Sequence, residues 1–183
     1  MTAPTSAPEQ DLRYPIGPAD RTSVLTAGQR AQRIDAINTT PVQLRLALAG
    51  LTDEQLDTPY RPDGWTVRQL VHHVADSHLN AYVRFRLGLT EENPTIKPYD
   101  EKRWAELADV THLPVEVSLK LLEALTERLV RLLHSLPEAA FKRTIVHPES
   151  GPMTLDTLLS IYGWHGRHHV AHVRALRARQ NWG

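Results

Sequence analysis

Hydrophobic residues recur at helical spacing through most of the chain from about residue 22 onward, between short loops marked by proline and glycine. Apolar side chains at positions i, i+3 and i+4 lie on one face of an α-helix, so each such segment predicts an amphipathic helix. No repeated strand pattern accompanies these segments. The hydrophobic pattern therefore predicts an all-α protein.

The first helical segment can be interpreted in two ways. Thr40 followed by Pro41 has the pattern of an N-cap and a first helical residue, and Gly50 would end that helix. The alternative is one longer helix that starts at about Thr26 and is kinked by Pro41. A short helical turn and a loop closed by a Pro-Asp-Gly turn follow in either case.

Three more long helices are predicted. The second begins at Thr66, which has capping-box spacing to Gln69, and continues to about Leu89. The third and fourth follow Pro114 and Thr154. A loop with two prolines leads to a short helix before the third, and β-favouring residues before the fourth predict a small β-hairpin or an extended connection.

These elements predict a four-helix bundle with short extra helices, because each amphipathic face needs another to cover it. One domain is expected for a chain of 183 residues. We expect residues 1–12 to be a disordered N-terminal lead and residues 13–183 to form a single helical domain.

Charge and hydropathy restrict the partners. The 21 basic and 21 acidic residues cancel, so the chain lacks the basic excess that a nucleic-acid-binding protein would have. No apolar run approaches the roughly 18 residues that cross a bilayer, and the N-terminus has no signal-peptide pattern. We therefore expect a cytoplasmic protein that binds neither nucleic acid nor membrane.

Cysteine is absent from the chain. Disulfide bonds, cysteine-ligated zinc and a cysteine nucleophile are thereby excluded. Any thiol chemistry would have to use a sulfur atom that a second molecule supplies.

The most unusual stretch is WHGRHHVAHV, residues 164–173, which holds four of the ten histidines. At 100° per residue, His165 and His169 fall within the apolar stripe of the last helix, His168 lies well off it, and His172 lies at its edge. Two histidines at i and i+4 can reach one metal ion. The alternative is that they are neutral, hydrogen-bonded histidines of the core.

A third ligand would come from VHHVADSH on the second long helix. His78 lies nearest the centre of the apolar face there, His73 lies on the flank, about 120° away, and His72 points largely the other way. Periodicity therefore leaves His73 and His78 as alternatives. The remaining histidines stand alone and are expected at surface or loop positions: His112, His134 and His147.

Longer stretches of the chain resemble the YfiT group of the DinB/YfiT superfamily. The resemblance rests on the block PYR…GWTVRQ…HHVADSH, on YPIG near the start, and on FKR…HP and YGWHGRHHVAHV later. It extends from about Arg13 to Trp182.

The resemblance implies a four-helix bundle that holds one divalent metal ion per chain with three histidines. These are His73, His165 and His169, so it selects His73 over His78. Zinc is the first expectation and nickel the alternative, since three-histidine sites accept several metals. The resemblance also implies a homodimer, and some members of the superfamily are thiol S-transferases that use bacillithiol.

Four arginines and one acid on the two ligand-bearing helices are further candidates. Asp76, one turn beyond His73, would accept a hydrogen bond or a proton from bound water, or would be a solvated surface carboxylate. Four guanidinium groups would hold an anionic substrate or belong to the polar faces of the helices: Arg68, Arg84, Arg86 and Arg167.

The expected function is that of a metal-dependent hydrolase that uses a metal-activated water on a small-molecule substrate. One alternative is a metal-dependent transferase that conjugates a low-molecular-weight thiol to an electrophile. The other is a non-catalytic interaction module that the metal stabilises.

Overall fold

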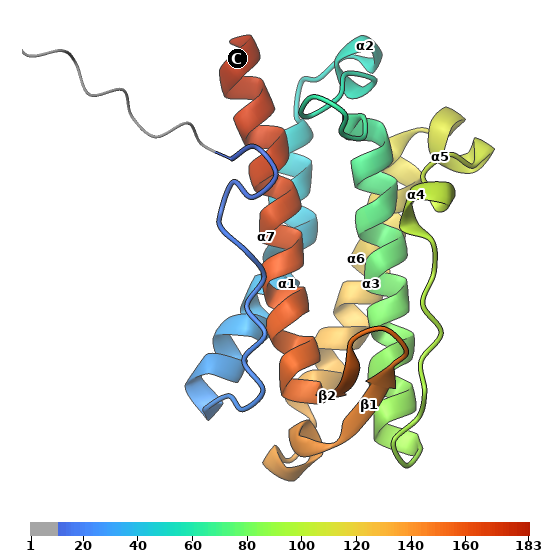
Figure 1. Ribbon diagram of the computed structural model, residues 1–183. Coiled ribbons are helices and arrows are strands. Elements are labelled where there is room, and N and C mark those ends of the chain that lie inside the picture. The colour runs from blue at the N-terminus through green and yellow to red at the C-terminus, as the bar shows by residue number, and fades with distance from the viewer. Residues whose placement is uncertain (1–10) are drawn as a thin grey trace, which may run out of the picture.

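The computed structural model describes residues 11–183, so most of the predicted N-terminal lead, residues 1–12, lies outside the described residues. Four long helices form a bundle (Figure 1). Their bounds are α1 Ala27–Leu48, α3 Val67–Thr90, α6 Val115–His134 and α7 Leu155–Gln180. The short elements are α2 Asp53–Leu56, α4 Glu101–Trp104, α5 Ala108–His112, the 3-10 helix η1 Glu138–Lys142, and the strands β1 Thr144–His147 and β2 Gly151–Thr154. Within the described part of the chain, no helix has the length and apolar character needed to span a membrane.

Helix α1 follows the longer of the two interpretations of the first segment. It begins after Thr26, whose side chain forms a reciprocal capping box with Gln29, and it continues through Pro41. The predicted helix start at Thr40 is wrong, because Thr40 and Pro41 are both buried inside the continuous helix. Pro41 cannot donate a backbone hydrogen bond, and its burial against the bundle offsets that loss.

The other predicted helix starts are confirmed. Thr66 and Gln69 form the capping box of α3, and the Thr154 side chain accepts a hydrogen bond from the Thr157 backbone at the start of α7. Each of these caps satisfies backbone N–H groups that have no partner within the helix. Helix α6 follows Pro114 and has no such side-chain cap.

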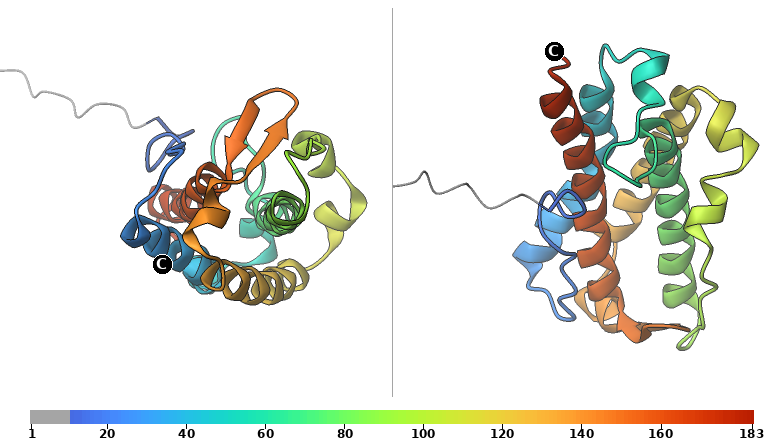
Figure 2. Two further views of the ribbon diagram at one scale, coloured as in Figure 1. Left: turned by 90° about the horizontal axis from the view of Figure 1, so that it is seen from below. Right: turned by 45° about the horizontal axis from the view of Figure 1, so that its top comes forward.

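The four helices form a closed ring in which α1 and α3 lie diagonally opposite each other (Figure 2). Helix α1 packs against α6 and α7, and α3 packs against the same two helices from the other side. Neighbours α3 and α6 run in the same direction, as do α1 and α7 (Figure 1). Residues 91–114 must therefore return along the whole bundle, and they do so on the outside of α3, carrying α4 and α5.

A two-stranded hairpin connects α6 to α7 at the opposite end of the bundle from α2 (Figure 1). Strands β1 and β2 pair antiparallel, from Thr144 opposite Thr154 to His147 opposite Gly151. The predicted small hairpin before the last helix is thus confirmed.

The apolar core consists of two clusters, one in each half of the bundle. The cluster nearer the hairpin includes Phe85 and Leu158, and the cluster nearer α2 includes Leu70 and Val173. Between them, α3 and α7 contribute a layer of histidine side chains rather than leucine or valine. The polar layer is therefore part of the bundle's interior and is not a feature of its surface.

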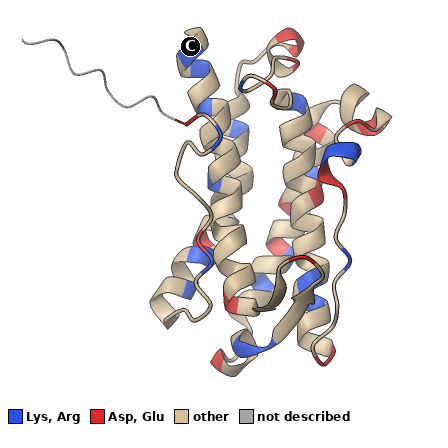
Figure 3. Cartoon of the chain, viewed as in Figure 1, with Lys and Arg blue, Asp and Glu red and all other residues tan. Residues whose placement is uncertain are grey.

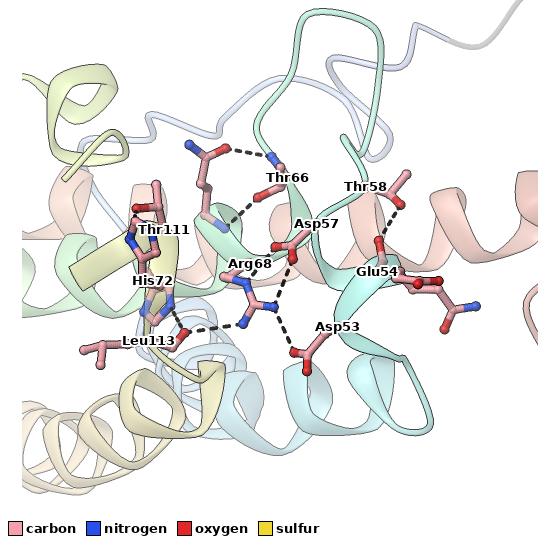
Figure 4. A network of polar contacts seen from close by, with 12 residues as sticks. Asp53, Glu54, Asp57, Thr58, Thr66, Arg68, His72, Thr111 and Leu113 are labelled. Atoms are coloured by element: carbon pink, nitrogen blue, oxygen red, sulfur yellow. Dashed lines mark hydrogen bonds and ion pairs between the residues drawn. The ribbon is translucent and has the colours of Figure 1, made fainter. Parts of the chain in front are cut away.

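A guanidinium network fixes the α2 end of the bundle (Figure 4). The Arg68 side chain, only 8% exposed, donates hydrogen bonds to Asp57 at 2.7 Å and Asp53 at 2.9 Å, and to the Leu113 carbonyl at 3.4 Å. One side chain of α3 thereby ties α2 to the junction of α5 and α6.

Charged residues of both signs are interspersed along the helices and loops of the bundle (Figure 3). One ion pair among them is buried: the Arg30 guanidinium donates two hydrogen bonds of 2.8 Å to Asp156, whose side chain is 1% exposed. The backbone N–H of Leu25 donates to the same carboxylate at 2.9 Å. This pair holds the start of α1 against the start of α7.

Candidate metal site

Three histidine side chains converge between α3 and α7. The Nε2 atom of His165 lies 3.3 Å from Nε2 of His73 and 3.2 Å from Nε2 of His169. Potential ligand atoms of these three residues all lie within 4.8 Å of one another. Two nitrogens bound at about 2.0–2.1 Å to one tetrahedral ion lie about 3.3 Å apart, so the observed spacing fits a shared metal ion.

Helix packing sets the depth of the two histidines on α7. Gly166, between His165 and His169 in the chain, faces Thr40 of α1, and a Cβ atom on Gly166 would overlap the Thr40 side chain. Glycine thus allows α1 and α7 to approach closely at this level. The close approach places the His165 and His169 rings toward α3, where His73 meets them.

Burial keeps the three imidazoles in the form that binds metals. It lowers the pKa of His73 to about 4, and together with the neighbouring histidines it lowers the pKa of His165 and His169 well below the ordinary value of 6.5. The rings are therefore neutral near pH 7, and lone pairs on nitrogen are available to a cation.

Ring packing orients these side chains. The ring centroids of His165 and His169 are 4.5 Å apart, and His73 packs on Trp65 at 4.6 Å. Among the described residues, the Nδ1 atoms of His165 and His169 have no hydrogen-bond partner. Aromatic neighbours, rather than a carboxylate, hold the rings in place.

His78, the residue that periodicity favours, lies deeper in the bundle. It is 1% exposed, its ring centroid is 5.8 Å from that of His165 and 5.6 Å from that of Tyr162, and neither ring nitrogen has a partner in the described chain. His78 is not a member of the converging group. The centre of an apolar helix face points into the core, whereas the three histidines converge at its flank.

His72 has a role in the fold. Its Nε2 lies 3.3 Å from the Leu113 carbonyl and its Nδ1 lies 2.7 Å from the Ser118 hydroxyl. Since a carbonyl only accepts, Nε2 donates to Leu113 and Nδ1 accepts from Ser118. Both nitrogens are thus used in joining α3 to the start of α6.

His168 and His172 form a second buried pair, which the helical phase did not indicate. They are 7% and 3% exposed, and their Nε2 atoms are 3.0 Å apart. The His168 ring stacks on Trp164 with centroids 4.1 Å apart and lies near Tyr14, while His172 packs on Tyr60 at 4.3 Å. Placing His168 off the buried side was wrong, because Trp164 of the same helix and Tyr14 of the N-terminal segment lie against its ring.

Asp76 is half-buried on α3, and burial together with the nearby Asp109 carboxylate raises its pKa to about 6. Asp109 belongs to α5, so a charge on the segment of residues 91–114 contributes to the raised pKa of Asp76. Its hydrogen-bonding or proton-accepting role at the metal stays a prediction.

Two cavities meet at His165. The first, the aromatic cavity, has a volume of about 600 Å³ and is lined by the converging histidines and by Tyr14, Tyr60, Trp65 and Trp164. The second, the hydroxyl cavity, has a volume of about 780 Å³ and is lined by Ser77, Arg84, Tyr99 and Tyr162. Glu101 and Lys102 of α4 line both cavities.

Sequence reasoning missed Tyr99 and the α4 residues at the cavities. No local pattern indicates them, since their position depends on the path of residues 91–114 across the bundle. The four aromatic residues of the aromatic cavity likewise come from three separate segments of the chain: Tyr14 from the N-terminal segment, Tyr60 and Trp65 from the loop before α3, and Trp164 from α7.

The chain is a four-helix bundle in which α1 runs parallel to α7 and α3 to α6, with a three-histidine cluster in its interior. These features place it in the class of four-helix-bundle proteins with a candidate metal site. Residues 36–173 match the DinB superfamily, and the chain belongs to that superfamily. The resemblance found in the sequence is thereby confirmed.

Individual relatives agree with this assignment. The chain is 52% identical over 173 residues to a protein of Bacillus mycoides (strain KBAB4) named "Putative metal-dependent hydrolase", covering 94% of this chain and 99% of the relative. A protein of Bacillus cereus (strain 03BB102) with the same name is 52% identical over 172 residues, with the same coverage.

A solved structure shows the same architecture. YfiT from Bacillus subtilis, described as a probable metal-dependent hydrolase with an unusual four-helix bundle topology, matches with a TM-score of 0.91 and 46% sequence identity. The match covers 94% of this chain and 99% of the YfiT chain. The predicted four-helix bundle is confirmed.

Proposed function

We propose that this protein is a metal-dependent hydrolase of small molecules in which His73, His165 and His169 hold one divalent metal ion. The observation that carries the proposal is the convergence of three neutral imidazoles beside two cavities, with the His165 Nε2 atom 3.2–3.3 Å from Nε2 of each of the other two. The names of the similar Bacillus proteins support the same function.

Three protein ligands favour catalysis over a structural role. Structural zinc sites are closed by four protein ligands, whereas the converging group in the described chain contains three. When bound, a divalent ion there supplies Lewis-acid chemistry, which lowers the pKa of water and polarises a carbonyl group. The neutral histidines leave the positive charge of the ion undiminished, and His165 faces both cavities, where a substrate would enter.

Zinc is the metal we expect first, with nickel as the alternative. Imidazole nitrogen suits both ions, and metal availability rather than the ligand set decides between them. Elemental analysis of protein purified without affinity-nickel resin would identify the ion, and we expect one per chain.

A thiol S-transferase is the second candidate. The two adjoining cavities of about 600 and 780 Å³ at His165 give room for an electrophile and a thiol together. The chain has no cysteine, so the thiol must be a cosubstrate, as bacillithiol is for some members of the superfamily. The same ion would stabilise the thiolate.

The deciding experiment incubates metal-loaded protein with model esters and model electrophiles, with and without a small thiol, and analyses the products by mass spectrometry. Hydrolysis without thiol, abolished in His165→Ala, supports the hydrolase. Conjugates that form only with added thiol establish the transferase. Identical product levels in wild type and His165→Ala would contradict both functions.

We also propose that the protein is a homodimer. Large apolar side chains remain exposed on α1 and α6, and a second copy could cover them: Val42, Leu46, Val117 and Leu121. Light scattering on the purified protein would give the mass directly, and a monomer would contradict this proposal.

A further inference from the structure

The hydroxyl cavity contains a cation that the protein itself does not neutralise. Arg84 is half-buried on α3, and among the described residues no carboxylate lies within ion-pair distance of it. Its Nε atom is buried without a hydrogen-bond partner in residues 11–183, and its Nη1 donates to the Tyr162 hydroxyl at 3.4 Å. Leaving a buried guanidinium donor unpaired costs free energy, so this group is arranged to receive an acceptor from elsewhere.

The other three candidate arginines differ from Arg84. Arg68 is neutralised by two aspartates. Arg86 is exposed and contacts the Tyr82 hydroxyl at 3.0 Å, and Arg167 is exposed and donates to the Gly163 carbonyl at 3.0 Å. Of these four arginines, only Arg84 lines a cavity that reaches His165.

Three hydroxyl groups line the hydroxyl cavity together with the Arg84 guanidinium: those of Ser77, Tyr99 and Tyr162. Burial raises the pKa of Tyr99 and Tyr162, and the opposing effects of the Ser77 hydroxyl and the Arg84 charge do not cancel this increase. Both phenols stay protonated near neutral pH, so they can donate hydrogen bonds. The floor of the hydroxyl cavity thus offers several O–H and N–H donors.

The exposed charged residues of the hydroxyl cavity restrict the charge that a bound group can carry. Three exposed acids line the cavity, Asp100, Glu101 and Glu149, together with the exposed Lys102. The cationic floor therefore favours an anionic group, and the acidic rim disfavours a group with two negative charges. A carboxylate satisfies both conditions, and a guanidinium matches it with two parallel hydrogen bonds.

We infer that Arg84, with the hydroxyls of Ser77, Tyr99 and Tyr162, binds a carboxylate group of the substrate beside the three-histidine site. This inference deepens the proposed hydrolase function and rests on it. Tyr162 contacts both groups: its hydroxyl lies 3.4 Å from Nη1 of Arg84, and its ring centroid lies 5.8 Å from that of His165. A substrate held in this way carries its carboxylate a short distance from the bond to be cleaved.

Binding to metal-free protein tests the inference without activity. Monomethyl glutarate, which has one carboxylate and one ester, is titrated by calorimetry into chelator-treated wild type, Arg84→Gln and Arg86→Gln. We expect at least a tenfold weaker affinity in Arg84→Gln and less than a twofold change in Arg86→Gln. Equal affinity in wild type and Arg84→Gln would overturn the inference.

Two further titrations test the same site, one with a second variant and one with a second anion. Tyr99→Phe removes one hydroxyl and keeps the ring, so it tests the site with little risk to folding, and we expect a threefold or larger loss of affinity. Inorganic phosphate should bind more weakly than the monocarboxylate. If phosphate binds more tightly through Arg84, a carboxylate substrate is excluded.

An activity assay with two esters distinguishes a failure of this inference from a failure of the proposed hydrolase function. Mono-4-nitrophenyl succinate and 4-nitrophenyl acetate present the same leaving group with and without a carboxylate. We expect Arg84→Gln to lower the ratio of kcat/KM for the succinate ester to kcat/KM for the acetate ester at least tenfold. Arg86→Gln, which lies outside both cavities, should change that ratio less than twofold. Hydrolysis of neither ester, with Arg84-dependent binding retained, would contradict the hydrolase and leave the carboxylate site standing.

Discussion

Gly166 of α7 lies directly against the Thr40 side chain of α1, with no room for a methyl group between the two helices. We predict that Gly166→Ala lowers the free energy of unfolding by about 1–3 kcal/mol through overpacking. Because Gly166 lies between His165 and His169, the shift of α7 should also weaken metal binding. Urea denaturation and metal titration would measure the two effects.

Gly28→Ala is the matched control for this prediction. A Cβ on Gly28 meets no atom within 4 Å, and the residue lies in the first turn of α1. Alanine is the better helix former, so stability should stay unchanged or rise by up to about 1 kcal/mol. Thr40→Ala should recover part of the loss when combined with Gly166→Ala. Equal effects of the two glycine substitutions would show that the α1–α7 contact is not tight.

The buried pair of Arg30 and Asp156 predicts a large asymmetry between single and double substitutions. Asp156→Asn leaves the buried Arg30 guanidinium with only the exposed Glu138 carboxylate, 3.6 Å away, as counter-charge, which should cost about 3 kcal/mol. Replacing both residues with apolar ones of similar size should cost much less. Asp11→Asn, in the exposed pair with Arg13, should leave the melting transition unchanged. A double variant as unstable as Asp156→Asn would contradict this account.

The buried histidines predict that metal-free protein loses stability in mildly acidic solution. Burial lowers the pKa of His73, His78 and His168 to about 4 and that of His172 to about 3, whereas an unfolded histidine titrates near 6.5. Above pH 6.5 the rings are neutral in both states, and they add no pH dependence. As the pH falls from 6.5 toward 4, only the unfolded chain gains protons, so unfolding is favoured.

Each such histidine should lower the free energy of unfolding by about 1.4 kcal/mol per pH unit in this range. Urea denaturation of chelator-treated protein between pH 7.5 and 5 measures the slope. Added metal should raise stability at neutral pH, because it binds the folded form. Stability that stays constant between pH 6.5 and 5 would show that these rings already carry protons in the folded state.

The ligand assignment predicts opposite results for two histidines on one helix. His73→Gln should lose bound metal, since it removes one of three converging nitrogens. His78→Gln should keep one metal ion per chain, because His78 lies outside that group. Elemental analysis of both variants decides, with circular dichroism as the check on folding. Metal loss in His78→Gln with retention in His73→Gln would reverse the assignment.

Local signals in the sequence predicted most of the fold. Capping residues such as Thr66 and Thr154 act within one helical turn, so their effect can be read from neighbouring positions. Pro41 was the exception, since its tolerance inside α1 depends on burial against other helices. Whether a proline ends a helix is thus settled by tertiary contacts.

The candidate site was predictable only in part. The i, i+4 spacing places His165 and His169 on one face of α7. On α3, helical phase favours His78 over His73, because the phase of a residue indicates how deeply its side chain lies in the core and not which side chains converge. Phase also misplaced His168, which Trp164 and the N-terminal segment cover. Residues from distant segments that line one cavity, such as Tyr99 and Ser77, leave no periodic signal.

The crossover of residues 91–114 divides the molecule into parts with different tasks. Helices α3 and α7 carry the three converging histidines, and the crossover supplies Tyr99, Glu101 and Lys102 to the cavity walls. Insertions or substitutions in this segment would therefore alter which molecules fit while leaving the nitrogen cluster intact. A library that varies residues 97–106 alone is the direct way to change the selectivity of this scaffold without rebuilding its reactive centre.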